Sequence, residues 1–342
     1  MSRGARSGER ELSEPGAPRA VVPLGQGFET PLAHRLAEKA ITGVAFVAIA
    51  AIVLIFVFIL KEALPLLWET ELHGEIGGLD ALFLPKQWAG YAEAVFVWQP
   101  VGTPSKLNVV PLLVGTLKVT VLAMLISVPA GVGAAIFVSQ YAPRSLREVI
   151  KPALELLASI PSVVLGFFAL IVLATWMQET FGLAYRLNAI VAACGLSLAV
   201  IPMIFTISED ALRAVPRELS EAAMALGARK WQTTLRVVVP AALPGIAAAV
   251  ILGFGRAIGE TMVVLMASGN AAVMELFDPT TSARTVTATI AAELGEVAQG
   301  DPHWRVLFLL GVLLFVITFA LNRLGAAVIA RLHRRLTAGV EA

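Results

Sequence analysis

Long apolar runs separated by shorter polar stretches fill the chain from about residue 40 to residue 328. Several runs hold about 20 uncharged residues, the length that an α-helix needs to cross a bilayer core of about 30 Å. None of them alternates as the strands of a membrane β-barrel do. The pattern predicts an all-α, polytopic membrane bundle of six transmembrane helices, at about 40–62, 112–138, 153–176, 188–208, 244–267 and 305–328.

The start of the fifth span has to be chosen, because its apolar run lasts from Val237 to Asn270. That run is too long for one helix and contains Pro240 and Pro244. Proline is well tolerated in the first turn of a helix, so we predict that the span begins at Pro244.

The distribution of basic residues indicates the orientation. With the N-terminus inside, most of the 26 lysines and arginines fall in inner segments, as the positive-inside rule requires. Both termini are therefore expected in the cytoplasm. Lys118, within the second span, is expected to snorkel or to pair near the outer interface.

The same pattern divides the chain into regions. Residues 1–34, rich in Arg, Glu, Gly, Ser and Pro, are expected to form a disordered cytoplasmic tail. Residues 35–335 form the transmembrane domain, and residues 336–342 a cytoplasmic C-terminus. Long outer loops are expected at 63–111 and 268–304, and a cytoplasmic loop at 209–240. The 268–304 loop contains TVTATIAAELGEV, which predicts a short amphipathic helix covering the outer face.

Composition narrows the function. Hydrophobic residues make up 57% of the chain and charged residues 15%, and the net charge of +1 gives no reason to expect a nucleic-acid partner. The four histidines are scattered and the one cysteine lies in an apolar run, so we predict neither a metal site nor a disulfide. No phosphate-binding loop of the form G-x-x-x-x-G-K-[ST] is present, so no ATPase or other catalytic residue is predicted.

The stretch GFGRAIGETMVV places Arg256 and Glu260 inside the fifth span. From Pro244, Arg256 lies roughly 18 Å along a helix, near the bilayer middle. Arginine there costs about 2.5–3.5 kcal/mol on insertion scales, so such residues usually serve a function. A guanidinium binds oxyanions, and a neighbouring carboxylate accepts a hydrogen bond from an anion that keeps a proton, as hydrogen phosphate does. A structural i,i+4 ion pair, a gate and a proton relay are the alternatives. Thr261 could donate to the same anion, although interhelical hydrogen bonding is its more ordinary role.

The 209–240 loop reads ELSEAAMALGARKWQTTLRVVVPAALPG. We predict a helix over 218–226 that Gly227 ends, because glycine adopts the left-handed cap at low cost. A second short helix is expected over 229–238. The first helix could dock in a groove of another protein or pack on its own bundle, and its pattern favours neither.

Glu221-Ala222-Ala223, then Gly227 and the VVVP ending at Pro240, resemble the EAA loop of ABC-transporter permeases. Val237 and Val239 replace the usual Ile and Leu. In that family the loop forms the coupling helix that sits in a cleft of the ATPase subunit. The resemblance therefore implies an ATPase-contacting role for Glu221, Ala222, Ala223 and Gly227, and a separate ATPase dimer that binds ATP and Mg.

GRAIGETMVVLMASGN, SIPSVVLG and LLVGTLKVT together resemble the C-type subunit of phosphate-specific ABC importers, over about residues 35–330. The resemblance implies the type I importer permease fold in a bacterial inner membrane. It also implies a homologous A-type permease subunit, an extracytoplasmic phosphate-binding protein, and a phosphate path with Arg256, Glu260 and Thr261. A permease for molybdate, sulfate or phosphonate, an ATP-independent channel or carrier, and an added role in signalling phosphate status remain open.

Overall fold

The computed structural model describes residues 32–69, 74 and 76–338. Within these residues six helical stretches are long and apolar enough to cross a membrane, which confirms the six-span, all-α prediction. Most of the expected N-terminal tail (1–31) and residues 339–342 of the C-terminus lie outside the described residues. The six stretches are Leu36–Leu67, Val110–Gln140, Ser162–Phe181, Ala189–Arg213, Lys230–Gly259 and Pro302–Arg331.

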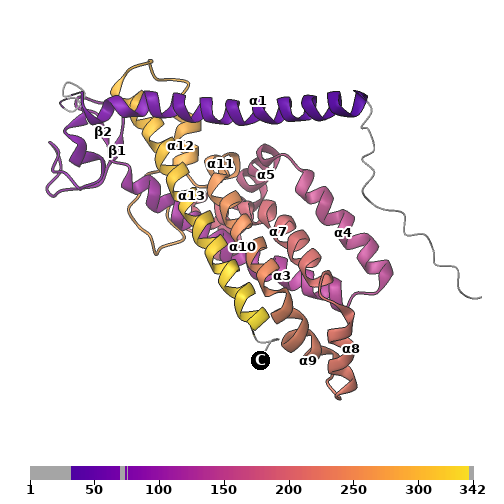
Figure 1. The fold of residues 1–342 in the computed structure, drawn as a ribbon. Helices are drawn as coiled ribbons and strands as arrows, with labels where there is room; N and C mark the ends of the chain where they lie inside the picture. The colour runs from indigo at the N-terminus through magenta and orange to yellow at the C-terminus, as the bar shows by residue number, and fades with distance from the viewer. Residues whose placement is uncertain (1–31, 70–73, 75, 339–342) are drawn as a thin grey trace, which may run out of the picture. The chain divides into compact units, whose positions relative to one another are not determined.

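The chain divides into one unit that ends at Ile55 and a second that begins at Phe56. Helix α1 (Leu32–Ala63) runs through the boundary. The second unit holds all other elements (Figure 1). They are β1 (Trp98–Gln99), β2 (Lys106–Leu107), α3 (Val110–Gln140), α4 (Arg144–Ser159), α5 (Ser162–Phe168), α6 (Ala174–Phe181), α7 (Ala189–Arg213), α8 (Arg217–Ala225), α9 (Lys230–Thr233), α10 (Val239–Gly259), α11 (Met262–Ala267), α12 (Val286–Glu293) and α13 (Pro302–Ala338).

Helix α7 is the centre of the second unit and packs against α3 and α10. Small residues let the three helices approach closely. Gly131 of α3 and Gly253 of α10 both lie against Ile204 of α7, and a β-carbon on either glycine would overlap that side chain. Lipid tails are as apolar as leucine, so van der Waals packing across small residues holds such helices together. Helix α13 covers α10, with Gly325 against Ile251.

The third span differs from the predicted 153–176. Residues 153–159 belong to α4, a separate helix in which no residue is fully buried. Pro161 holds Ile160 in an extended conformation, because proline disfavours helical geometry in the residue before it. The span therefore begins at Ser162 and comprises α5, a π-helical turn (Ala169–Leu173) and α6.

The fifth span begins and ends earlier than the predicted 244–267. Helix α9 and a π-helical turn (Thr234–Val238) lead directly into α10, so the span is Lys230–Gly259. Pro240 takes the first turn of α10, the place predicted for Pro244, which lies inside the helix. Pro240 is tolerated there because the first N–H groups of a helix have no carbonyl partner within that helix.

The described residues between 64 and 109 are folded at one end of the bundle rather than forming an open loop. Trp98 and Leu107 pair across the β1–β2 hairpin. These two residues belong to an apolar cluster that also contains residues of the 3₁₀ turns Leu64–Leu67 and Leu79–Leu82, α12 and α13. The cluster joins both predicted outer loops into one structure.

The 268–304 loop enters the bundle instead of lying on its surface. The predicted helix is present as α12, but Val286, Thr287, Ala288 and Thr289 are all buried, so the expected amphipathic surface helix is wrong. Gly115 of α3 makes room for this segment, because a β-carbon there would overlap the carbonyl oxygen of Arg284. The N–H of Val286 also donates to Oγ1 of Thr116 at 3.0 Å. Short threonine and alanine side chains let the segment fit.

Gly115→Leu is therefore expected to destabilise the permease by about 1–3 kcal/mol, the usual cost of overpacking, because the clashing atom belongs to the backbone. The midpoint of thermal unfolding of the purified complex measures the effect. Gly133→Leu is the matched control, since nothing lies within 4 Å of its added β-carbon on the same helix. Equal midpoints for the two variants would show that the Gly115 contact does not constrain the loop.

Candidate functional site

Helix α8 carries the predicted coupling residues and projects from the bundle (Figure 1). None of its residues is buried: Glu221 and Ala222 are exposed, and Ala223 is half-buried. Leu226, just beyond the helix, is 90% exposed. A short exposed helix with apolar side chains and small residues favours docking to another protein over packing in its own bundle.

Gly227 ends α8 as predicted, through a Schellman motif. Its φ of 88° is in the left-handed region. The N–H of Gly227 donates to the carbonyl of Met224 at 2.9 Å, and the N–H of Ala228 to that of Ala223 at 3.1 Å, which satisfies two carbonyls of the last turn. The second predicted helix differs, because residues 230–238 continue into α10 instead of ending separately.

Arg256, Glu260 and Thr261 lie together where the fifth span breaks. Helix α10 ends at Gly259, Glu260 is extended (φ −72°, ψ 131°), and α11 begins at Met262. Although the two residues are four positions apart, no ion pair joins Arg256 to Glu260 among the described residues. Arg256 is exposed, while Glu260 and Thr261 are half-buried. This arrangement argues against a purely structural ion pair.

The break lies near the middle of the bundle. Ile201 is the central residue of α7, and Gly253 of α10 contacts Val200 and Ile204, on either side of that centre. Arg256 is one turn further along α10. A cation therefore lies close to the mid-depth of the spans, where an arginine needs a cavity, a partner subunit or an anion.

The backbone at the break is held by the 268–304 loop. Thr287 Oγ1 of α12 donates to the carbonyl oxygen of Glu260 at 3.0 Å. Among the residues that the structure describes, Thr261 Oγ1 donates only to the carbonyl of Gly259, at 3.4 Å. The break and the loop that enters the bundle therefore form one structural unit.

Lys118 is paired, which is one of the two alternatives that the sequence analysis gave for it. It is buried in α3 rather than snorkelling, and its Nζ donates to the carbonyl of Glu275 at 2.8 Å and to Thr281 Oγ1. The 268–304 loop brings both acceptors to it. A single lysine in an apolar run indicated that its charge needs a partner. The partners could not be identified from the sequence, because they lie more than 150 positions away.

Glu209 is a residue that the sequence analysis missed. It is fully buried in α7 and forms ion pairs with Lys151 of α4 and Arg213 of its own helix. The i,i+4 spacing of Glu209 and Arg213 was the available signal. These pairs fix α4 against α7 at the end of the bundle that carries α8.

At the opposite end, Glu293 of α12 gathers three partners. Arg284 forms an ion pair with it, His303 of α13 lies 2.8 Å from its Oε2, and Trp98 Nε1 donates at 3.2 Å. Burial raises the pKa of Glu293, but the bonds from His303 and Trp98 and the charge of Arg284 outweigh it, so the pKa lies below its ordinary value. No group of histidines, cysteines and acids in the described part of the chain could hold a metal ion.

The lowered pKa of Glu293 predicts that the folded protein loses stability in acid. A carboxyl whose pKa is depressed by folding contributes stability above its unfolded pKa of about 4.3 and loses it as the pH falls through the folded value. The thermal midpoint of the intact complex should therefore fall below pH ~4.3 more steeply than that of Glu293→Gln. Glu296→Gln, an exposed neighbour, should behave like the intact chain. Parallel curves for all three proteins would contradict the prediction.

Comparison with known proteins agrees with this architecture. Residues 127–337 match the family described as binding-protein-dependent transport system inner membrane component. The chain is 37% identical over 222 residues to the "Probable ABC transporter permease protein YqgH" of Bacillus subtilis, covering 65% of this chain and 72% of that protein. It is 37% identical over 259 residues to the phosphate transport system permease protein PstC of Mesorhizobium japonicum, covering 70% of this chain and 77% of that protein.

The fold is similar to a chain of the bacterial alginate ABC transporter, solved in complex with an alginate-bound periplasmic protein. The TM-score is 0.54 at 16% identity, over 84% of this chain and 93% of that one. This likeness confirms the predicted type I importer permease fold. With the family match over residues 127–337, it identifies the chain as an ABC importer permease subunit that belongs to the family of binding-protein-dependent transport system inner membrane components.

Proposed function

We propose that this chain is the membrane-spanning C-type subunit of an ATP-driven phosphate importer. It forms the translocation path with a homologous A-type permease subunit. The observation that carries the proposal is the exposed Arg256 at mid-depth of the spans, beside the helix break at Glu260. The similarity to PstC of Mesorhizobium japonicum, named as a phosphate transport system permease, supports the choice of substrate.

The chemistry of the break fits hydrogen phosphate. A guanidinium offers a planar fork of donors to two phosphate oxygens. Glu260 is not engaged by Arg256, so its carboxylate can accept a hydrogen bond from the protonated oxygen of hydrogen phosphate. Sulfate has no such proton and would face the carboxylate unfavourably. Thr261 adds a hydroxyl donor. The site is expected to bind weakly, so that phosphate is released.

Helix α8 supplies the proposed coupling to a separate ATPase dimer, which binds ATP and Mg. Its exposure leaves Glu221, Ala222 and Ala223 accessible to a groove of that partner. In this proposal, α8 and both chain termini lie in the cytoplasm of a bacterial cell, and the predicted outer loop at 63–111 lies across the inner membrane from them. An extracytoplasmic binding protein would deliver phosphate at that outer end.

Uptake of labelled phosphate tests the proposal, in cells without phosphate importers of their own that receive the complete complex. Excess sulfate is the competitor, and the same complex lacking its ATPase is the control. Phosphate uptake that needs the ATPase and resists sulfate is expected. Competition by sulfate, molybdate or a phosphonate would make the chain a permease for another oxyanion. Uptake that persists without the ATPase would point to a channel or carrier.

A further inference from the structure

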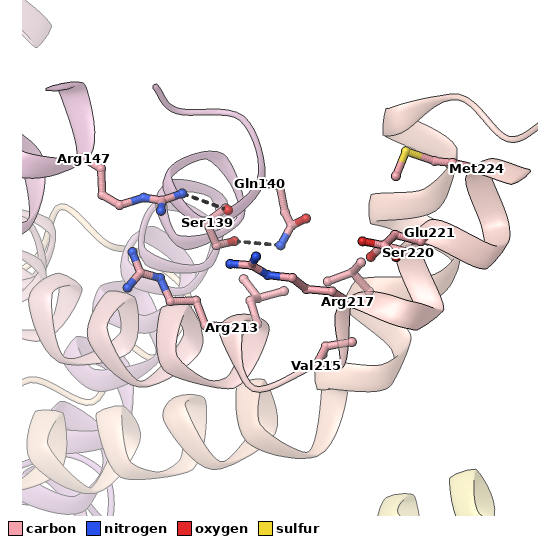
Figure 2. Close-up of a pocket in the computed structure, with 11 residues that line it drawn as sticks. Ser139, Gln140, Arg147, Arg213, Val215, Arg217, Ser220, Glu221 and Met224 are labelled. Carbon is pink, nitrogen blue, oxygen red and sulfur yellow. Dashed lines mark hydrogen bonds between the residues drawn. The ribbon is translucent and has the colours of Figure 1, made fainter. Parts of the chain in front are cut away.

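A second concentration of positive charge lies at the α8 end of the bundle, away from Arg256. A cavity of about 560 Å³ opens where the ends of α3 and α7 meet the beginnings of α4 and α8. That volume is within the range of about 300–1,000 Å³ typical of small-molecule sites. Arg147 of α4, Arg213 of α7 and Arg217 of α8 all line it, and Figure 2 shows their guanidinium groups gathered around Ser139 and Gln140.

The three arginines differ in how many of their guanidinium N–H groups already have an acceptor. Arg147 donates from Nε and Nη2 to the carbonyls of Val138 and Ser139, at 2.9–3.2 Å, which fixes it at the end of α3 and leaves Nη1 for another acceptor. Arg213 pairs through Nε with Glu209. Arg217 has neither a hydrogen bond nor an ion pair among the described residues, although it points into the cavity. The cavity thus offers unused guanidinium donors from three elements.

The acidic residues nearby do not balance these charges. Glu209 is shared between Lys151 and Arg213. Of the residues that line the cavity only Glu221 is acidic, against three arginines. The positive charges of the three arginines repel one another. An oxyanion bound between them would replace this repulsion with attraction between the anion and each guanidinium. Ser139, Gln140 and Ser220 line the same space and add neutral donors.

We propose that this cavity binds the phosphate group of an anion, either inorganic phosphate or the headgroup of an anionic lipid. Arginine clusters with convergent, unpaired donors recognise phosphate groups bidentately. Arg147 and Arg213 belong to the bundle, whereas Arg217 begins α8, so the anion joins the coupling helix to the bundle. Occupancy restrains α8 in the position seen here. The proposal is independent of which substrate passes Arg256.

Equilibrium binding to the complete complex, purified in maltoside detergent that contains no phosphate, tests the site. Labelled inorganic phosphate is one probe, and phosphatidylglycerol followed by native mass spectrometry is the other. Arg217→Gln is compared with Arg229→Gln, an exposed arginine beyond α8 that does not line the cavity. All proteins carry Arg256→Gln, so that binding at the proposed transport site does not contribute. Co-purification of the ATPase shows that each variant assembles.

Arg217→Gln should raise the half-saturating concentration of at least one probe about tenfold or more, the usual effect of losing hydrogen bonds to a charged group, and Arg229→Gln should leave it unchanged. A response to phosphate alone identifies a free-ion site, and a response to phosphatidylglycerol alone identifies a headgroup site. Binding of neither probe, or equal affinities in the two variants, would overturn the proposal. Occupation of the cavity by an ATPase carboxylate in a structure of the complex would overturn it too.

Discussion

Phosphate uptake by the complete complex is expected to fall by at least about tenfold when Arg256 is replaced by Gln, because the variant loses charge-assisted hydrogen bonds worth about 1.5–3 kcal/mol. Glutamine keeps a polar side chain of similar reach but offers no positive charge. Arg256 is exposed and makes no ion pair among the described residues, so its replacement leaves no buried group unpaired. The fold should therefore survive, and the loss should fall on transport.

Two further variants make this experiment decisive. Arg256→Lys keeps the charge without the planar fork, and we expect an intermediate uptake rate. Arg323→Gln makes the same change at an exposed arginine of α13 and should transport like the intact chain. If Arg256→Gln assembles and transports normally, then Arg256 is not part of the phosphate path. If Arg323→Gln fails equally, general charge rather than a local site accounts for the loss.

Ala222→Arg is expected to abolish uptake by separating the permease from its ATPase. Ala222 is exposed on α8, and its small side chain lets a partner approach the helix closely. Arginine is a good helix former, so α8 should keep its conformation while a long charged side chain fills the docking surface. The amount of ATPase that co-purifies with the tagged permease measures the effect directly.

Ala214→Arg is the matched control for this variant, because Ala214 is exposed in the turn between α7 and α8. It should retain the ATPase and most of the uptake. Normal co-purification with Ala222→Arg would show that α8 does not form the contact. Loss of the ATPase in both variants would mean that the whole end of the bundle, and not α8 in particular, is sensitive to added charge.

The hydrophobic pattern was sufficient to predict the six spans, since each must supply about 20 apolar residues whatever its neighbours are. It was less informative about their ends. Proline signals were ambiguous: Pro161 separates α4 from α5, Pro240 begins a helix, and Pro244 lies within one. The break at Glu260 has no proline, and it is stabilised by a hydrogen bond from Thr287, 27 positions away. Such a contact belongs to the tertiary structure and leaves no local pattern.

Among the candidate residues too, local features could be predicted from the sequence, whereas tertiary contacts could not. Gly227 was predicted as a helix end because its conformation is a local property, and its φ of 88° confirms it. The contacts of Lys118 and Glu209 depend on partners that the fold brings from other elements. The path role of Arg256, Glu260 and Thr261 and the coupling role of Glu221, Ala222, Ala223 and Gly227 remain predictions, for which the helix break and the exposed α8 now supply a geometry.

The buried position of α12 has a consequence for the biogenesis of the protein. The segment from Arg284 to Thr289 contains a charge and several hydroxyl groups, and it lies against Gly115 and Thr116 of a spanning helix. Such backbone is stable at membrane depth only when protein surrounds it. It cannot partition into lipid during synthesis, so it must fold inward after α3, α10 and α13 have been inserted and have assembled. Folding of the bundle therefore ends with a step that follows the translation of all six spans.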